Sequence, residues 1–389
     1  MMNIKLLEVL KKYTMVFALI AVVIFFYTQT EGKILYPQNI NNLISQNAYV
    51  FVLAAGMLLC ILTGGNIDLA VGSVVCFVGG IGAVMMDKDI NVWAAVAVML
   101  IGGLLVGAWQ GFWIAYVKVP PFIATLAGMY AFRGLANVVM KGFAIGVRNE
   151  TFLNVFGGGA NCYVPDFFHG TNLNITCMAA GILVALVYIA FTMKKRMSAR
   201  AKGYDIESLS QVVPKMVVIC AVVIWIFYKL AQYQGIPAGL LWIALVLVAY
   251  GYITSKTTVG RYLYAVGGNE KATRLSGIDS RKIYFFAYIN MGLMAGLGGI
   301  LTVARATQAQ PTFGQGYEMD AIAACFIGGA SAYGGEGGIF GVIIGAVLMG
   351  VINQGMSIMG MSANYQSIVK GLVVLIAIIF DVLSNKKKK

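Results

Sequence analysis

The sequence predicts an all-α polytopic membrane protein of about 10–12 transmembrane helices. Of its 389 residues, 60% are hydrophobic and only 11% are charged, whereas an ordinary soluble domain has about 25% charged residues. The chain holds about twelve apolar runs, and one span needs about 20 mostly apolar residues. We therefore expect a single transmembrane domain over residues 1–389, with a mean hydropathy of +0.82.

The expected spans follow one another along the whole chain. The first covers residues 13–27; no small-residue cleavage site follows it, so we expect it to remain uncleaved. The next runs cover residues 48–62, 69–86, 92–117, 122–140, 173–193 and 215–230. The last ones cover residues 239–253, 283–303, 319–332, 339–359 and 366–382. Some of these runs are shorter than a full span, so the count stays between ten and twelve.

Basic residues gather in alternate gaps between the spans. Gaps on one side of the membrane carry 20 of the 28 lysines and arginines. These gaps are residues 5–12, 118, 194–215, 256–282 and 386–389. We expect the protein to lie in the inner (plasma) membrane. The positive-inside rule places these gaps and both termini on its cytoplasmic side, and it places residues 141–172 and 304–318 on the outer side. Residues 194–214 then form a charged cytoplasmic insert, and the lysine tail anchors the last helix to lipid.

The same charge and residue counts exclude several function classes. The net charge of +13 is spread over these short gaps, which indicates a membrane surface as its partner and not nucleic acid. The chain has one histidine, His169, and six cysteines without a C-x-x-C pair. Neither a metal site nor a catalytic site is expected.

Two glycine-rich breaks interrupt the spans, one in each half of the chain. Residues 63–73 form the first and residues 326–341 the second. Backbone that leaves a helix at membrane depth must be buried in protein or line a wet cavity. Broken helices in both halves are typical of transporters whose pathway lies between the halves. A close-packed turn is the alternative, and Asp68 could either bind a cation or substrate or cap the next helix.

A third unusual segment is the cytoplasmic loop 257–282. Its middle, residues 269–275, predicts a short helix outside the membrane, with Asn269 as its cap, Glu270 in its first turn and Gly277 as its stop. The alternative is a solvated connector.

Four motifs in order resemble one family. Residues 260–278 closely resemble the coupling-loop signature of permease subunits of ATP-binding-cassette importers for monosaccharides, the ribose, xylose and galactose group. Residues 64–73 are similar to its G-G-I-D-L-S-V-G-S motif, with Asn66 as an extra residue. Residues 121–134 resemble its P-x-F-I-x-T-L segment, and residues 316–329 its fourth motif. The length and the insert favour xylose or multiple-sugar permeases.

The resemblance implies a set of partners and a division of labour. A permease of this family pairs with a second permease, usually a copy of itself, above two ATPase subunits and below an extracytoplasmic sugar-binding protein. The sequence lacks a G-x-x-x-x-G-K-[ST] phosphate loop, so we expect no cofactor in this chain and ATP on the partner. The residues implied in coupling to the ATPase are Gly267, Asn269, Ala272, Arg274, Leu275, Ser276, Gly277 and Ile278.

A neutral sugar needs hydrogen-bonding groups and aromatic faces along its path. The candidates for the pathway are Asn66, Asp68, Tyr130, Arg133, Asn137 and Asp320. Arg133 and Asp320 could equally form buried ion pairs or snorkel to the interface. Arg305 and Lys370 lie nearer to span ends, and we expect both to snorkel.

Three other functions compete with sugar import. A permease of the same fold class for branched-chain amino acids or nucleosides would have the same hydropathy. An ion-coupled secondary transporter would need buried titratable groups and no docking loop. A membrane enzyme is disfavoured by the scarcity of histidine and clustered carboxylates.

Overall fold

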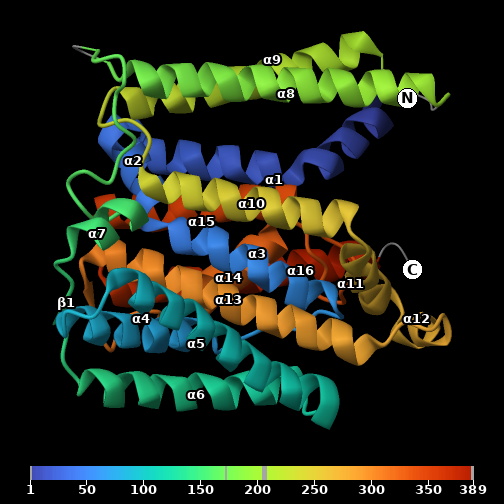
Figure 1. The fold of residues 1–389 in the computed structure, drawn as a ribbon. Helices are drawn as coiled ribbons and strands as arrows, with labels where there is room; N and C mark the ends of the chain where they lie inside the picture. Colours follow the sequence, from blue (N-terminus) through green and yellow to red (C-terminus); the bar gives the residue numbers. More distant parts are fainter. Residues whose placement is uncertain (1, 171–172, 204–207, 387–389) are drawn as a thin grey trace.

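The computed structural model describes residues 2–170, 173–203 and 208–386, and it is built almost wholly from helices (Figure 1). The first helices are α1 (Met2–Gln29), η1 (Lys33–Leu35), α2 (Pro37–Gln46), α3 (Ala48–Leu62), α4 (Val71–Asp87), α5 (Val92–Phe112), η2 (Trp113–Val117), α6 (Pro121–Met140) and α7 (Glu150–Phe156). The later ones are α8 (Ile175–Ala201), α9 (Leu209–Ala231), α10 (Ala238–Lys256), α11 (Thr258–Gly268), α12 (Glu270–Leu275), α13 (Ser280–Ala306), α14 (Tyr317–Ile327), α15 (Ile339–Ile358) and α16 (Ala363–Lys386). Strands β1 (Ile145–Gly146) and β2 (Gln308–Ala309) pair antiparallel. The all-α fold class is confirmed.

Seven of the described helices are long and apolar enough to cross a membrane. They are α5 with η2, α6, α8, α9, α10, α13 and α15. Helices α2 and α3 pass the same test together as a span bent by 41°. Shorter apolar helices cover Met15–Gln29, Val71–Asp87 and Ala363–Ile379.

Two expected segments have different bounds in the structure. The run expected over residues 319–332 is the 11-residue helix α14, because the glycines at 328 and 329 end it. The insert 194–214 is largely helical: α8 runs on to Ala201 and α9 starts at Leu209, while residues 204–207 lie outside the described residues. So do residues 387–389 of the lysine tail.

Helix α3 forms the centre of the protein. All 15 of its residues are buried, and it packs against α13, α14, α10 and α15. Such a helix is apolar on every side because protein surrounds it. Helix α13 packs against α5 on its other face, where a Cβ on Gly292 would lie 2.2 Å from the Gly103 carbonyl oxygen. Small residues let these two backbones approach closely.

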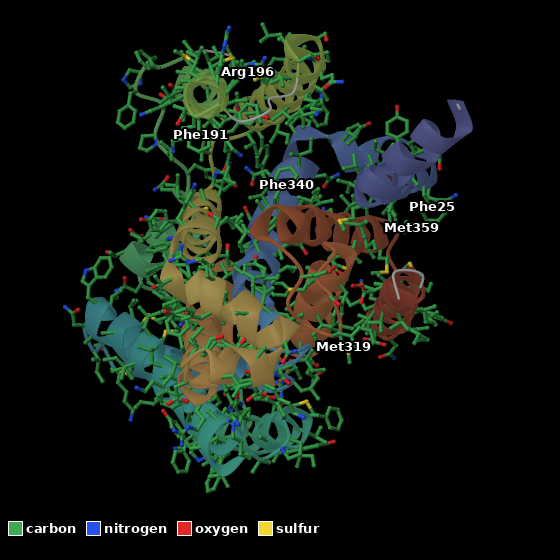
Figure 2. The ribbon with its side chains drawn as sticks, turned by 90° about the vertical axis from the view of Figure 1, so that its right-hand side faces the viewer. Phe25, Phe191, Arg196, Met319, Phe340 and Met359 are labelled. Carbon is green, nitrogen blue, oxygen red and sulfur yellow. The ribbon has the colours of Figure 1, made fainter. Side chains whose placement is uncertain are left out.

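Helices α8 and α9 form a hairpin along one edge of the molecule, and α6 lies at the opposite edge (Figure 1). Figure 2 shows Phe191 and Arg196 on this hairpin, apart from the main body. Only Cys177, Gly181 and Ala185 of α8 are buried. The hairpin therefore presents most of its apolar surface outward, as lipid-facing helices do.

The long helices run roughly parallel, so the molecule has two ends (Figure 1). Helix α12, the start of α1 and the end of α16 lie at one end, while β1 and α7 lie at the other. Helix α13 joins these ends, because Ser280 follows α12 and Ala306 precedes β2.

Candidate functional site

The two glycine-rich breaks lie against each other. The Gly335 amide donates a hydrogen bond to the Leu62 carbonyl oxygen at 3.1 Å. A Cβ on Gly65 would lie 1.8 Å from the Ala332 carbonyl oxygen, and the φ of +76° at Gly65 also favours glycine. The breaks therefore pack backbone against backbone, and each shields part of the other's polar main chain from lipid.

The end of α11 joins this contact. A Cβ on Gly267 would lie 1.8 Å from the Leu62 carbonyl oxygen and 2.5 Å from the Gly335 amide nitrogen. The Tyr264 hydroxyl donates to the Gly337 carbonyl oxygen at 2.8 Å. Three segments that sequence analysis treated separately thus meet at one place, which we call the junction: residues 62–65, 332–337 and 264–268.

Helix α12 projects next to the junction. Asn269 caps it, since its side-chain oxygen accepts from the Ala272 amide at 3.0 Å. This local structure matches the helix expected from the sequence, because the Asn cap satisfies a free amide of the first turn.

Polar side chains fix α12 to the start of α13. The Ser280 hydroxyl donates to Glu270 at 2.8 Å and accepts from the Arg274 Nε at 2.8 Å. Arg274 also forms an ion pair with Glu270 at 3.3 Å. The Tyr284 hydroxyl donates to the other Glu270 oxygen at 3.2 Å. Arg274 is therefore part of the internal framework, although half of its side chain is exposed.

The residues predicted to couple to a partner divide into two groups. Gly267 lies in the junction, and Ile278 is half-buried against the core. The others are exposed: Asn269, Ala272, Arg274, Leu275, Ser276 and Gly277. Leu275 is 90% exposed, the highest value among the large exposed apolar side chains. Their role in coupling stays a prediction.

Asn66 and Asp68 lie in the first break. The Asp68 side chain is buried and accepts a hydrogen bond from the Ala70 amide at 2.8 Å. This bond closes a turn just before α4, whose N-cap residue is Ala70 and has no side-chain cap bond, so neither sequence interpretation of Asp68 is confirmed. The Asn66 amide donates to the Thr63 carbonyl oxygen at 3.3 Å. Among the described residues, no group of three His, Cys, Asp or Glu side chains could hold a metal ion.

Asp320 and Lys370 form a buried ion pair. The Lys370 Nζ lies 2.8 Å from Asp320 Oδ2, and the Asp320 side chain is fully buried. The Tyr49 hydroxyl donates to the same oxygen at 2.6 Å. The expectation that Lys370 snorkels to the interface is wrong, because its ammonium group points inward to a buried carboxylate.

The three pathway candidates on α6, Tyr130, Arg133 and Asn137, do not contact the pathway candidates in the first break. Arg133 donates to the carbonyl oxygens of Pro311 and Phe313 at 3.2 and 2.5 Å, so it holds the loop before α14. Tyr130 is 70% exposed. Asn137 is also exposed.

Replacing Arg133 by Gln is expected to destabilise the protein by about 1.5–3 kcal/mol, the usual range for hydrogen bonds to a charged group. Two carbonyl oxygens of a part-buried loop would lose their donor. Thermal unfolding of the detergent-purified protein measures this. Arg281→Gln is the control, because its guanidinium is exposed and bonds only to Asp279 among the described residues. A melting temperature equal to that of the unmodified chain would show that Arg133 does not stabilise the loop before α14.

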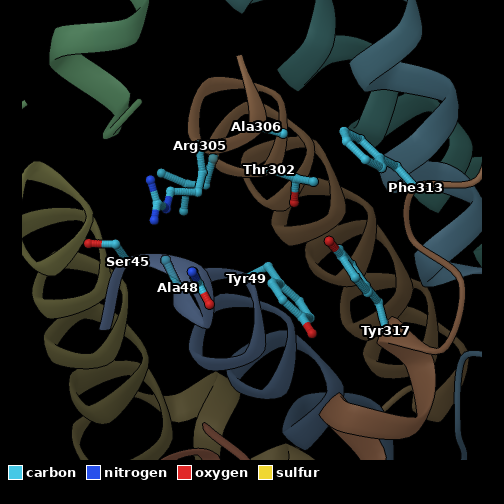
Figure 3. Close-up of a pocket in the computed structure, with 10 residues that line it drawn as sticks. Ser45, Ala48, Tyr49, Thr302, Arg305, Ala306, Phe313 and Tyr317 are labelled. Atoms are coloured by element: carbon cyan, nitrogen blue, oxygen red, sulfur yellow. The ribbon is translucent and has the colours of Figure 1, made fainter. Parts of the chain in front are cut away.

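A pocket of about 360 Å³ lies between the ends of α3, α13 and α14, away from the junction (Figure 3). The rings of Tyr49 and Tyr317 stack at 3.6 Å in it. Thr302 and Arg305, from the last turns of α13, form another wall. Sequence analysis missed these pocket residues, except for the basic charge of Arg305. No sequence spacing links Tyr49 to Tyr317, since they lie 268 positions apart.

Helix α3 connects the pocket to the junction, and helix α13 connects the pocket to α12. Helix α3 carries Tyr49 in its first turn and Leu62 at its last residue. At 1.5 Å per residue this helix is about 22 Å long. Helix α13 carries Ser280 at one end and Arg305 near the other. Helix α3 is thus a continuous, fully buried element between the pocket and the junction.

Comparison with known proteins identifies the family. The sequence profile described as "branched-chain amino acid transport system / permease component" matches residues 39–378. The chain belongs to this family. It is 34% identical to the xylose transport system permease protein XylH of Escherichia coli (strain K12) over 384 residues, which cover 97% of this chain and 93% of that protein.

Further members of the family are similar over nearly the same length. The XylH protein of Haemophilus influenzae (strain ATCC 51907 / DSM 11121 / KW20 / Rd) is 35% identical over 97% of this chain and 98% of its own. The ribose import permease protein RbsC of Escherichia coli (strain K12) is 33% identical over 90% of this chain and 86% of its own. No solved structure matches the chain significantly.

Proposed function

We propose that this chain is the permease subunit of an ATP-binding-cassette importer and that it translocates a monosaccharide of the xylose and ribose class. Its full-length similarity to xylose and ribose permeases supports the substrate class. The observation that carries the mechanism is the junction, where both broken segments and the end of α11 touch through their main chains.

The proposed assembly contains this permease, a second copy of it, two cytoplasmic ATPase subunits and an extracytoplasmic sugar-binding protein. Helix α12 docks on the ATPase. In this arrangement the cytoplasmic face of the inner membrane carries α12 with the rest of residues 257–282, the insert and both termini. ATP is bound by the partner. Its hydrolysis cycle moves α12, and the junction passes this motion to α3 and α14, so that the pathway alternates between two states.

The pathway in this proposal passes along the broken segments. Asn66, Asp68 and Asp320 lie on them or next to them. Asp68 accepts from the Ala70 backbone amide, whereas Asp320 bonds to the Tyr49 and Lys370 side chains. Tyr130 and Asn137 face outward on α6. They line a path only if the second permease copy faces that helix, and Arg133 acts on the path through the loop that it holds.

Uptake into reconstituted vesicles tests the proposal. Vesicles with the permease, the ATPase and the binding protein are expected to accumulate radiolabelled xylose or ribose only with ATP inside the compartment that holds the ATPase. Uptake driven by a proton or sodium gradient without ATPase would favour an ion-coupled carrier. Uptake of leucine in place of sugar would favour the amino-acid alternative.

Leu275→Asp is expected to lower co-purification of the ATPase about tenfold, because a charge replaces an apolar side chain at the centre of the proposed contact. Leu275 is 90% exposed, so the permease itself has little reason to unfold. Quantitative co-purification from membranes measures the effect. Reversing the charge of Arg274 is a poorer probe, since it would also break the bonds to Glu270 and Ser280.

Lys282→Gln is the control for the Leu275 variant. This side chain is exposed near the start of α13 and is not one of the eight residues predicted to couple to the ATPase. Unchanged ATPase recovery with Leu275→Asp would remove α12 from the docking surface.

A further inference from the structure

The pocket between α3, α13 and α14 combines aromatic faces with polar groups. Tyr49, Tyr317 and Phe313 supply rings, while Ser45, Thr302 and Arg305 supply hydroxyl and guanidinium groups (Figure 3). Small-ligand sites commonly hold about 300–1,000 Å³ and pair apolar walls with a few polar groups. At about 360 Å³ this pocket lies at the small end of that range.

The charges of the pocket select a class of ligand. Arg305 is the one charged residue among the ten that line it, and none of the ten is acidic. A free amino acid would bring an ammonium group that these residues leave without a carboxylate. A neutral polyhydroxylated molecule needs donors and acceptors for its hydroxyls, which Ser45, Thr302 and Arg305 provide.

Two polar atoms in the pocket wall have no hydrogen-bond partner among the described residues: the Thr302 hydroxyl oxygen and the Arg305 Nε. The Arg305 Nη2 donates to Asn42 at 3.3 Å, whereas its buried Nε has no hydrogen-bond partner among the described residues. An unpaired buried donor is costly. A ligand hydroxyl at this place would satisfy it.

The stacked tyrosines form the inner wall. The Tyr49 hydroxyl is already bonded to Asp320, which is fully buried and does not line the pocket. Each ring belongs to a different element: Tyr49 to α3, which ends at the junction, and Tyr317 to α14, which runs into the second break. Movement of either broken segment would therefore displace one of the two tyrosines that face a bound ligand.

We propose that this pocket is a monosaccharide-binding site of the permease itself, in which the sugar lies beside Tyr49, Tyr317 and Phe313 and bonds to Thr302 and Arg305. This inference rests on the proposed function and adds a site within the chain, separate from the sugar-binding protein.

Protection of an introduced cysteine tests the site. Ser45→Cys in the full-length permease, held in lipid nanodiscs, is treated with a small water-soluble methanethiosulfonate reagent, with xylose, ribose, leucine or no addition. A bound ligand blocks the thiol in proportion to occupancy, so sugar at about ten times its Kd is expected to slow modification about tenfold. Leucine is expected to have no effect. Five native cysteines are buried and Cys220 is half-buried, so the unmodified chain gives the background rate.

Matched variants make the result specific. Ser357→Cys places a thiol on the exposed face of α15, outside the pocket, and should react at one rate with or without sugar. Adding Thr302→Val or Arg305→Gln to Ser45→Cys should abolish the protection. Gln46→Cys, another lining position, serves if Ser45→Cys does not insert.

The outcomes separate this inference from the proposed function. No protection by either sugar, in a permease whose ATP-driven sugar uptake is intact, overturns the pocket and leaves the proposed function standing. If sugar slows the modification of Ser357→Cys as much as that of Ser45→Cys, the pocket assignment is also overturned. Protection by leucine alone, together with leucine uptake, overturns both.

Discussion

Gly267→Ala is expected to lower ATP-driven sugar uptake by about a hundredfold or more, which is a larger effect than one methyl group usually has. The added Cβ would lie 1.8 Å from the Leu62 carbonyl oxygen and 2.5 Å from the Gly335 amide nitrogen. Both neighbours are main-chain atoms, so no rotamer change can relieve the clash. The end of α11 must then move off the two breaks. Initial uptake rates in the reconstituted vesicles measure the loss.

The adjacent residue supplies the control. A Cβ on Gly268 would meet no atom within 4 Å, so Gly268→Ala is expected to transport at nearly the normal rate. Both variants replace a glycine by alanine at the end of the same helix, and they differ only in what the methyl group meets. Equal uptake by the two variants would show that the junction is not part of the transport mechanism.

Asp320→Asn is expected to destabilise the permease by about 3–5 kcal/mol, because it leaves the Lys370 ammonium buried without a counter-charge. Lys370→Met should have a similar effect, since the fully buried Asp320 carboxylate would keep only the Tyr49 hydroxyl as its bonded partner among the described residues. The apparent melting temperature of the protein in detergent, followed by size-exclusion chromatography after heating, measures both.

The double variant distinguishes an ion pair from two separate effects. Asp320→Asn combined with Lys370→Met removes both charges, so its loss of stability is expected to be smaller than the sum of the single losses. Strict additivity would mean that the two side chains do not stabilise each other. Glu31→Gln is the surface control, because its pairing with Lys33 at 3.6 Å is largely exposed and contributes little.

Local features could be predicted from the sequence and long-range ones could not. Composition predicts the all-α class. Asn269 and Gly277 predict the start and the end of helix α12, because a cap and a stop act only on the residues next to them. The glycines of both breaks indicate that another segment packs closely against them. Because glycine has no side chain, the sequence does not identify which segment that is. Asp320 and Lys370 each read as an isolated charge, because 50 residues separate them.

The same limit explains the missed pocket. Tyr49 and Tyr317 are ordinary aromatic residues at the starts of two helices, and only the packing of α3 against α14 brings them together. Arg305 reads as a snorkelling residue at a span end, yet it lines the pocket. The bounds of α14 and the helical insert also differ from expectation, since hydropathy detects apolar length and not where a helix stops.

The contacts at the junction also have a mechanical consequence for the proposed transport cycle. Where two surfaces meet through side chains, a small displacement of one is taken up by rotamer changes within a few ångströms. Gly267 touches Leu62 and Gly335 through main-chain atoms alone, so there is no soft layer to compress. In the proposed mechanism, this direct main-chain contact would pass a displacement of the end of α11 on to the end of α3 without loss to side-chain rearrangement.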